Sequence, residues 1–120
     1  MSPVQVVEKE IKMEDKIFFA LSLEMKNADM VFLSEEENQL GTLAVAIPQA
    51  QELVGVPISS VLLGDKNAAT ARVFAEQFAQ KTKKIALVSV FTRTLNEREA
   101  GPIFVKLVKK LAETEEIQTK

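Results

Sequence analysis

The chain has 120 residues, of which 47% are hydrophobic and 27% charged, and this composition predicts one soluble globular domain over residues 1–120. It contains no cysteine and no histidine, which excludes disulfides, thiolate nucleophiles, cysteine–zinc sites and histidine general bases. A formal net charge of -2 argues against nucleic acid as a partner, and the absence of a signal peptide or a long apolar run argues against a membrane, so we expect a cytoplasmic location.

The first half of the chain is predicted to form strands with short connections. Residues 4–13 alternate weakly and carry charges on one side, as expected of a strand at the edge of a sheet. Residues 16–26 place apolar side chains at every second position, and a third strand over 30–34 follows a tight turn. Residues 35–38 are predicted to be a polar loop, and a fourth strand covers 41–47. Four consecutive strands predict an antiparallel meander.

The second half is predicted to alternate between strands and helices. Residues 49–57 have no clean periodicity, and a short fifth strand follows over 58–63. Residues 67–81 carry one apolar stripe at helical spacing and are preceded by Asp and Asn residues that can cap a helix. The strand over 85–91 is apolar on both faces, which predicts a central place in the sheet. The last helix is predicted to begin near Pro102, because proline fits the first helical position.

Three of these strands are apolar on both sides, whereas two helices can cover only one face of a six-stranded sheet. Burying a Leu- or Phe-sized side chain is worth roughly 1.5–3 kcal/mol, so leaving about five exposed forgoes on the order of 10 kcal/mol. A monomer seldom leaves such a patch uncovered. We therefore expect an α+β fold in which a six-stranded antiparallel β-sheet has two main helices packed on one face and uses the other face for dimerisation. The predicted dimer-interface residues are Phe19, Leu21, Leu43, Val45, Ile85 and Leu87.

Two alternatives would remove this interface. Residues 49–57 and the N-terminal strand could fold over the second face and leave a monomer. A slip of one residue in strand register would exchange the two faces.

The usual catalytic and ligand-binding motifs are absent from the sequence. The Gly64-Asp65-Lys66 turn lies between a strand and a helix, but it lacks the first glycine and the lysine position of a phosphate loop. The acidic run at 35–37 lacks calcium-loop spacing. No serine has a histidine partner to activate it. The sequence therefore predicts a protein that is not an enzyme and has no cofactor and no metal site.

Several short motifs follow one another in a distinctive order. They are Gly-Thr-Leu (41–43), Leu-Ala-Val-Ala (43–46), a Pro-bearing segment ending in Leu-Leu-Gly-Asp (57–65), Val-Phe-Ala (73–75), Lys-Thr-Lys-Lys (81–84) and Val-Ser (88–89). In this order and spacing they resemble the proteasome assembly chaperone 3/4 family, and its chaperone 4 members most of all, over roughly residues 30–115. The loop after Phe91 is longer than in the family, and Trp and Tyr are absent.

The resemblance implies a six-stranded antiparallel sheet, dimerisation through stacked sheets, and binding of proteasome α-subunits to promote assembly of the α-ring, without catalysis or cofactor. The partner in the dimer would be the chain itself or a homologous assembly chaperone, giving a homodimer or a heterodimer. Features of both chaperones in one chain suggest an undifferentiated, archaeal-type homologue that pairs with itself. The alternative is a dimeric α+β adaptor or scaffold module for another protein complex. A small-molecule binder or enzyme is a third hypothesis, which a deep polar pocket would support.

Overall fold

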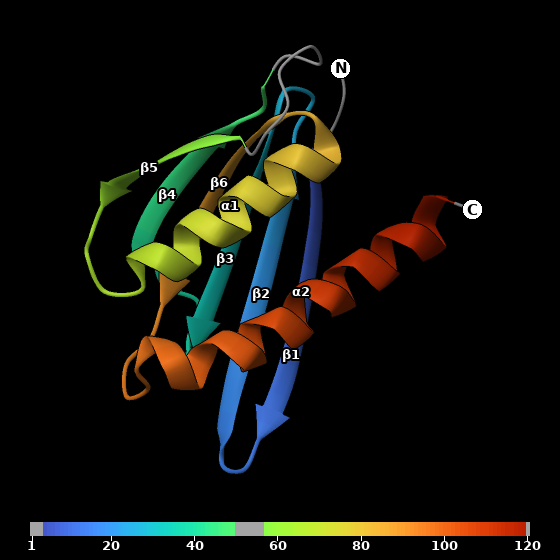
Figure 1. The fold of residues 1–120 in the computed structure, drawn as a ribbon. Helices are drawn as coiled ribbons and strands as arrows, with labels where there is room; N and C mark the ends of the chain where they lie inside the picture. The colour runs from blue at the N-terminus through green and yellow to red at the C-terminus, as the bar shows by residue number, and fades with distance from the viewer. Residues whose placement is uncertain (1–3, 50–56, 120) are drawn as a thin grey trace.

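A computed structural model describes residues 4–49 and 57–119, which form one six-stranded sheet and two helices on one side of it (Figure 1). Within these ranges, no helix combines the length and the hydrophobicity that crossing a membrane requires. In chain order the elements are β1 (Gln5–Met13), β2 (Lys16–Glu24), β3 (Ala28–Glu35), β4 (Thr42–Ile47), β5 (Ile58–Leu63), α1 (Ala68–Thr82), β6 (Ile85–Phe91) and α2 (Glu97–Thr119).

The strand order in the sheet is β1-β2-β3-β6-β4-β5. The predicted α+β fold with six strands and two main helices is confirmed, and β6 has the central position that its two apolar faces indicated. The sheet is mostly antiparallel but mixed, because β3 and β6 run parallel to each other. The predicted meander therefore covers only β1 to β3, since β6 and not β4 pairs with β3. A strand that is apolar on both faces is stabilised most at the centre of a sheet, where neighbouring strands flank it and packed layers bury both of its faces.

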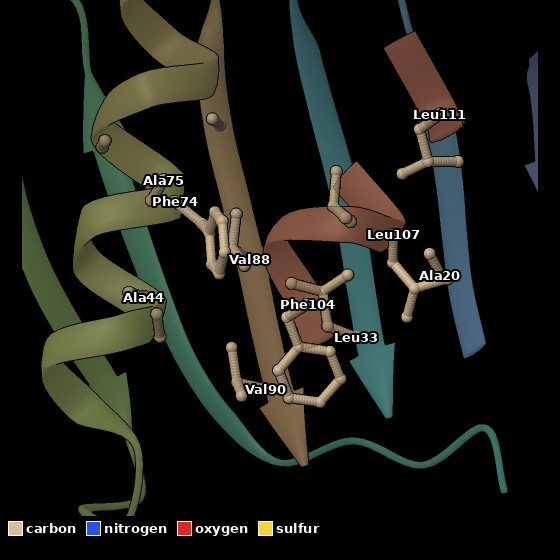
Figure 2. Packing of buried hydrophobic residues seen from close by; sticks show 14 of the residues in the cluster. Ala20, Leu33, Ala44, Phe74, Ala75, Val88, Val90, Phe104, Leu107 and Leu111 are labelled. Carbon is tan, nitrogen blue, oxygen red and sulfur yellow. The ribbon is translucent and has the colours of Figure 1, made fainter. Parts of the chain in front are cut away.

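Both helices pack on the same face of the sheet, α1 over β4, β6 and β5, and α2 over β2 and β1 (Figure 1). Where α1 crosses the sheet, small residues meet small residues, and Ala44 and Ala75 are both completely buried (Figure 2). Under α2 the core contains larger side chains, and the rings of Phe18 and Phe104 meet edge to face with centroids 6.0 Å apart. The core thus lies between the helices and one face of the sheet.

The start of α2 differs from the prediction. The helix begins at Glu97, five residues before Pro102. The backbone N–H of Glu99 donates to Asn96 Oδ1 (2.9 Å), and the backbone N–H of Asn96 donates to the Glu99 carboxylate (3.0 Å). This reciprocal capping box satisfies two N–H groups that would otherwise lack partners, and it outweighs the preference of proline for the first helical position. Pro102 lies inside the helix on an exposed position.

Two glycines should respond in opposite ways to substitution by alanine. Gly64 has φ +86°, and a Cβ there would lie 2.5 Å from Thr42 Oγ1, so Gly64→Ala should destabilise the fold by about 1–2 kcal/mol. Gly101 lies within α2 with nothing near its Cβ position, so Gly101→Ala should stabilise by about 0.5–1 kcal/mol. Urea unfolding of both variants measures the two effects. Equal effects would contradict the backbone conformation described for Gly64.

Candidate interaction surface

The face of the sheet that is turned away from α1 and α2, called the open face below, is largely apolar. Side chains alternate along each strand: in β4, Ala44 and Ala46 are buried under the helices, whereas Leu43, Val45 and Ile47 retain solvent exposure. Strand pairing carries this alternation across the sheet. The apolar side chains of the open face include Phe19, Leu21, Leu23, Met30, Phe32, Leu43, Val45, Ile47, Ile58, Leu63, Ile85, Leu87 and Phe91.

The structure places all six predicted interface residues on the open face. Val45 of β4 lies opposite Leu87 of β6, and Leu43 and Ile85 belong to the same two strands. Phe19 and Leu21 lie on β2, separated from that group by β3. Their role in dimerisation stays a prediction.

The residues that join these two groups were not among the predicted interface residues. Met30 pairs with both Leu23 and Leu87, and Phe32 pairs with Leu21, so β3 makes the apolar surface continuous. Period-two alternation in β3 was the signal that could have identified them. On the far side, Ile58 of β5 extends the surface to the sheet edge and is 65% exposed.

β1 gives the open face a charged border. Glu8 and Glu10 lie opposite Leu21 and Phe19 of β2, so two carboxylates flank the apolar surface on this side. β1 pairs with β2 at the sheet edge and does not fold over the open face, which removes one part of the monomer alternative. The other part concerned residues 49–57, and of these 50–56 lie outside the described residues.

A completely buried carboxylate, Glu35, occupies the end of β3. The prediction of an exposed polar loop at 35–38 is wrong for this residue. Its carboxylate accepts hydrogen bonds from the backbone N–H groups of Arg93 (2.8 Å), Thr94 (3.0 Å) and Leu95 (3.2 Å) and from the Thr94 hydroxyl, and Lys16 Nζ lies 3.7 Å away. Burial by itself raises the pKa of Glu35, but these donors outweigh it and lower the pKa from 4.5 to about 2. Glu35 thus holds the connection from β6 to α2.

The Lys-Thr-Lys-Lys segment at 81–84 has a structural explanation. Lys83 adopts a left-handed conformation (φ 60°) and its N–H donates to the carbonyl of Ala79 (2.9 Å), which ends α1. Lys84 Nζ then lies 3.2 Å from Asp29 Oδ1 at the start of β3 and donates to the carbonyl of Met25 (2.9 Å) in the turn before it. This motif therefore closes a helix and attaches it to the sheet.

The first turn of α1 is capped from α2 and not from its own chain segment. Asp65 and Asn67 were the expected caps, but Asn67 is left-handed (φ 68°) and makes no side-chain cap bond. Instead, Glu97 accepts hydrogen bonds from the backbone N–H and the hydroxyl of Thr70, both at 2.6 Å. A carboxylate at a helix N-terminus is stabilising, so Glu97 couples the first turns of the two helices.

The cavities do not suggest a catalytic centre. One of about 390 Å³ lies between the N-terminal halves of α1 and α2, with Val73, Phe74 and Val105 in its wall. A smaller one of about 120 Å³ reaches Asp29, whose carboxylate is already paired with Lys84. Among residues 4–49 and 57–119, no cluster of three or more potential metal ligands occurs. The apolar open face is therefore the strongest candidate for a functional surface.

Comparison with known proteins leads to one family. The sequence model of the family described as proteasome assembly chaperone 4 matches residues 12–90, about two thirds of the chain. Among solved structures, the chain is similar to one from the crystal structure of a novel chaperone complex for yeast 20S proteasome assembly. The TM-score is 0.69 at 12% sequence identity over 98% of both chains, a likeness of fold. No curated protein matches in sequence.

Proposed function

We propose that this chain, which belongs to the proteasome assembly chaperone 4 family, is a non-catalytic cytoplasmic chaperone that dimerises through its open face and binds proteasome α-subunits, promoting assembly of the core-particle α-ring. The observation that carries this proposal is the open face, combined with family membership. This apolar surface spans five neighbouring strands. A sheet exposes an apolar surface of this extent when a second protein packs on it and completes the core.

Stacking of two sheets supplies that second half of the core. Face-to-face sheets pack about 10 Å apart with interdigitated side chains, and helices then lie on the outside of both layers. Ile47 and Ile58 are 52% and 65% exposed, and burial of each such side chain stabilises the dimer by up to roughly 1.5–3 kcal/mol. Glu8 and Glu10 would remain at the rim, where they keep their hydration.

The partner in the dimer is either a second copy of the chain or a homologous assembly chaperone. A two-fold homodimer needs a self-complementary surface. From β3 to β5 the open face carries no charged side chain, so neither a homodimer nor a heterodimer would bring like charges together there. A chaperone of this kind acts by mass action, because it stabilises the association-competent form of a subunit and must then leave. Surfaces outside the open face suit that transient contact better than the open face does.

Isolation of the tagged chain from its own cells, followed by native mass spectrometry, tests the proposal. We expect a species with two chaperone-sized chains, at least one of them this 13.3 kDa chain, in association with one or more proteasome α-subunits. Removal of the chain should also lower the yield of complete α-rings. Recovery of a dimer with subunits of another complex, and with α-ring assembly unaffected, would favour an adaptor and contradict the chaperone function.

A further inference from the structure

The two edge strands of the sheet, β1 and β5 (Figure 1), differ sharply in charge. β1 carries Glu8, Lys9, Glu10 and Lys12 on its central positions, and charges of this kind discourage pairing with a foreign strand. β5, with the sequence ISSVLL, carries no charged residue and no proline. One edge is therefore protected against strand addition, and the other is not.

The unprotected edge is also accessible. Among the described residues, β5 pairs with β4 alone, so every second backbone N–H and C=O of β5 faces away from the sheet. Ile58, Leu62 and Leu63 at this edge are 65%, 54% and 46% exposed. Stacking of open faces would cover apolar side chains but would leave the outward backbone groups of β5 without protein partners.

The surroundings of β5 define what kind of strand would fit. On the open-face side, Ile58 and Ser60 lie opposite Ile47 and Val45 of β4. On the helix side, the hydroxyl of Ser59 donates to the carboxylate of Glu76 and accepts from Nε of Arg72 (3.0 Å). A complementary strand therefore has apolar side chains toward the open face and polar ones toward this pair of opposite charges.

We propose that the free edge of β5 accepts an extended, amphipathic segment of the bound proteasome α-subunit as a seventh strand of the sheet. The inference rests on the proposed function, since it identifies where on the chaperone that subunit is held. Backbone hydrogen bonds would give affinity, and the alternation of side chains would select the segment. A second copy of β5 that pairs Ser60 with Ser60 fits less well, because it would place the apolar Val61 opposite Ser59, beside Arg72 and Glu76.

Hydrogen exchange of the full chain, alone and mixed with purified proteasome α-subunits, tests the proposal. In the free protein, alternate amides over 58–63 should exchange quickly, and in the complex their exchange should slow at least tenfold. Ser59→Lys should weaken subunit binding at least tenfold, because a charged side chain at an edge opposes strand addition, and Ser59 lies on the helix side, away from the open face. Ser59→Thr, which keeps the hydroxyl, is the matched control and should change subunit binding less than threefold. Native mass measurement should show the same oligomer for both variants.

The outcomes separate this inference from the proposed function. If α-subunits bind while β5 exchanges as fast as before, and Ser59→Lys binds normally, strand addition at β5 is wrong and the chaperone function stands. Protection of β5 in the free protein that grows with protein concentration would identify a second copy as the occupant and overturn the proposal. If no α-subunit binds, both proposals fail.

Discussion

Replacing Val45 by glutamate should convert the proposed dimer into a monomer or an insoluble chain. Val45 lies opposite Leu87 near the centre of the open face, so the substitution would bury an unpaired carboxylate in the stacked interface of each copy. The combined loss of apolar burial and cost of desolvation should reach at least about 3 kcal/mol per dimer, which weakens Kd by more than a hundredfold. Sedimentation equilibrium of the purified chain measures the change.

Val105→Glu provides the matched control for this experiment. Val105 is 42% exposed on α2, which packs on the opposite face of the sheet, so its replacement should leave the dimer intact. Leu87→Glu should repeat the effect of Val45→Glu from the neighbouring strand. If Val45→Glu remains a soluble dimer with unchanged Kd, the open face is not the interface.

Replacing Glu35 by glutamine should cost about 3 kcal/mol of folding free energy near pH 7. The pKa of this buried carboxyl group is lowered from 4.5 to about 2 in the folded chain, and each pKa unit corresponds to about 1.4 kcal/mol. Because the folded pKa is the lower one, this stabilisation is complete above the unfolded pKa of 4.5 and disappears as the pH falls toward 2. Glutamine lacks the charge and turns an amide N–H₂ group toward N–H donors.

Urea unfolding between pH 7 and pH 3 measures this difference. The gap between wild type and Glu35→Gln should narrow progressively below about pH 5. Glu36→Gln is the control, because its carboxylate pairs with Arg93 at the surface, and such pairs contribute at most about 1 kcal/mol. If the difference in unfolding free energy between wild type and Glu35→Gln stays constant with pH, the charge of Glu35 does not contribute to stability.

The faces of the sheet were predictable from the sequence because a strand has a period of two. In β2, β4 and β6, buried residues under the helices, such as Ala20, Ala44 and Ala86, alternate with larger apolar residues of the open face, such as Leu21, Val45 and Leu87. The same alternation identified the six interface candidates. It does not reveal which strands are neighbours, so the parallel pairing of β3 with β6 could not be predicted from local pattern.

The buried environment of Glu35 was hidden for a related reason. Its hydrogen-bond partners at 93–95 are 58 to 60 positions away in the sequence, whereas its immediate neighbours, Glu36 and Glu37, suggest a solvated acidic loop. The start of α2 was predicted wrongly because two N-terminal signals, Asn96 with Glu99 and Pro102, compete within one short segment. Only the folded chain shows which one the helix uses.

The parallel pairing of β3 with β6 divides the sheet into two parts, β1 to β3 and β4 to β6, that share a single line of hydrogen bonds. Each end of that line is joined by a carboxylate: Asp29 near the start of β3 meets Lys84 just before β6, and Glu35 at the end of β3 meets the residues just after β6. Closing this line brings together positions 57 apart, such as Ala28 and Ile85, so it should be a slow step of folding. As the pH falls toward 2 and Glu35 is protonated, the pairing of β3 with β6 should therefore open first at the end that Glu35 holds, which hydrogen exchange of the amides at 93–95 would measure.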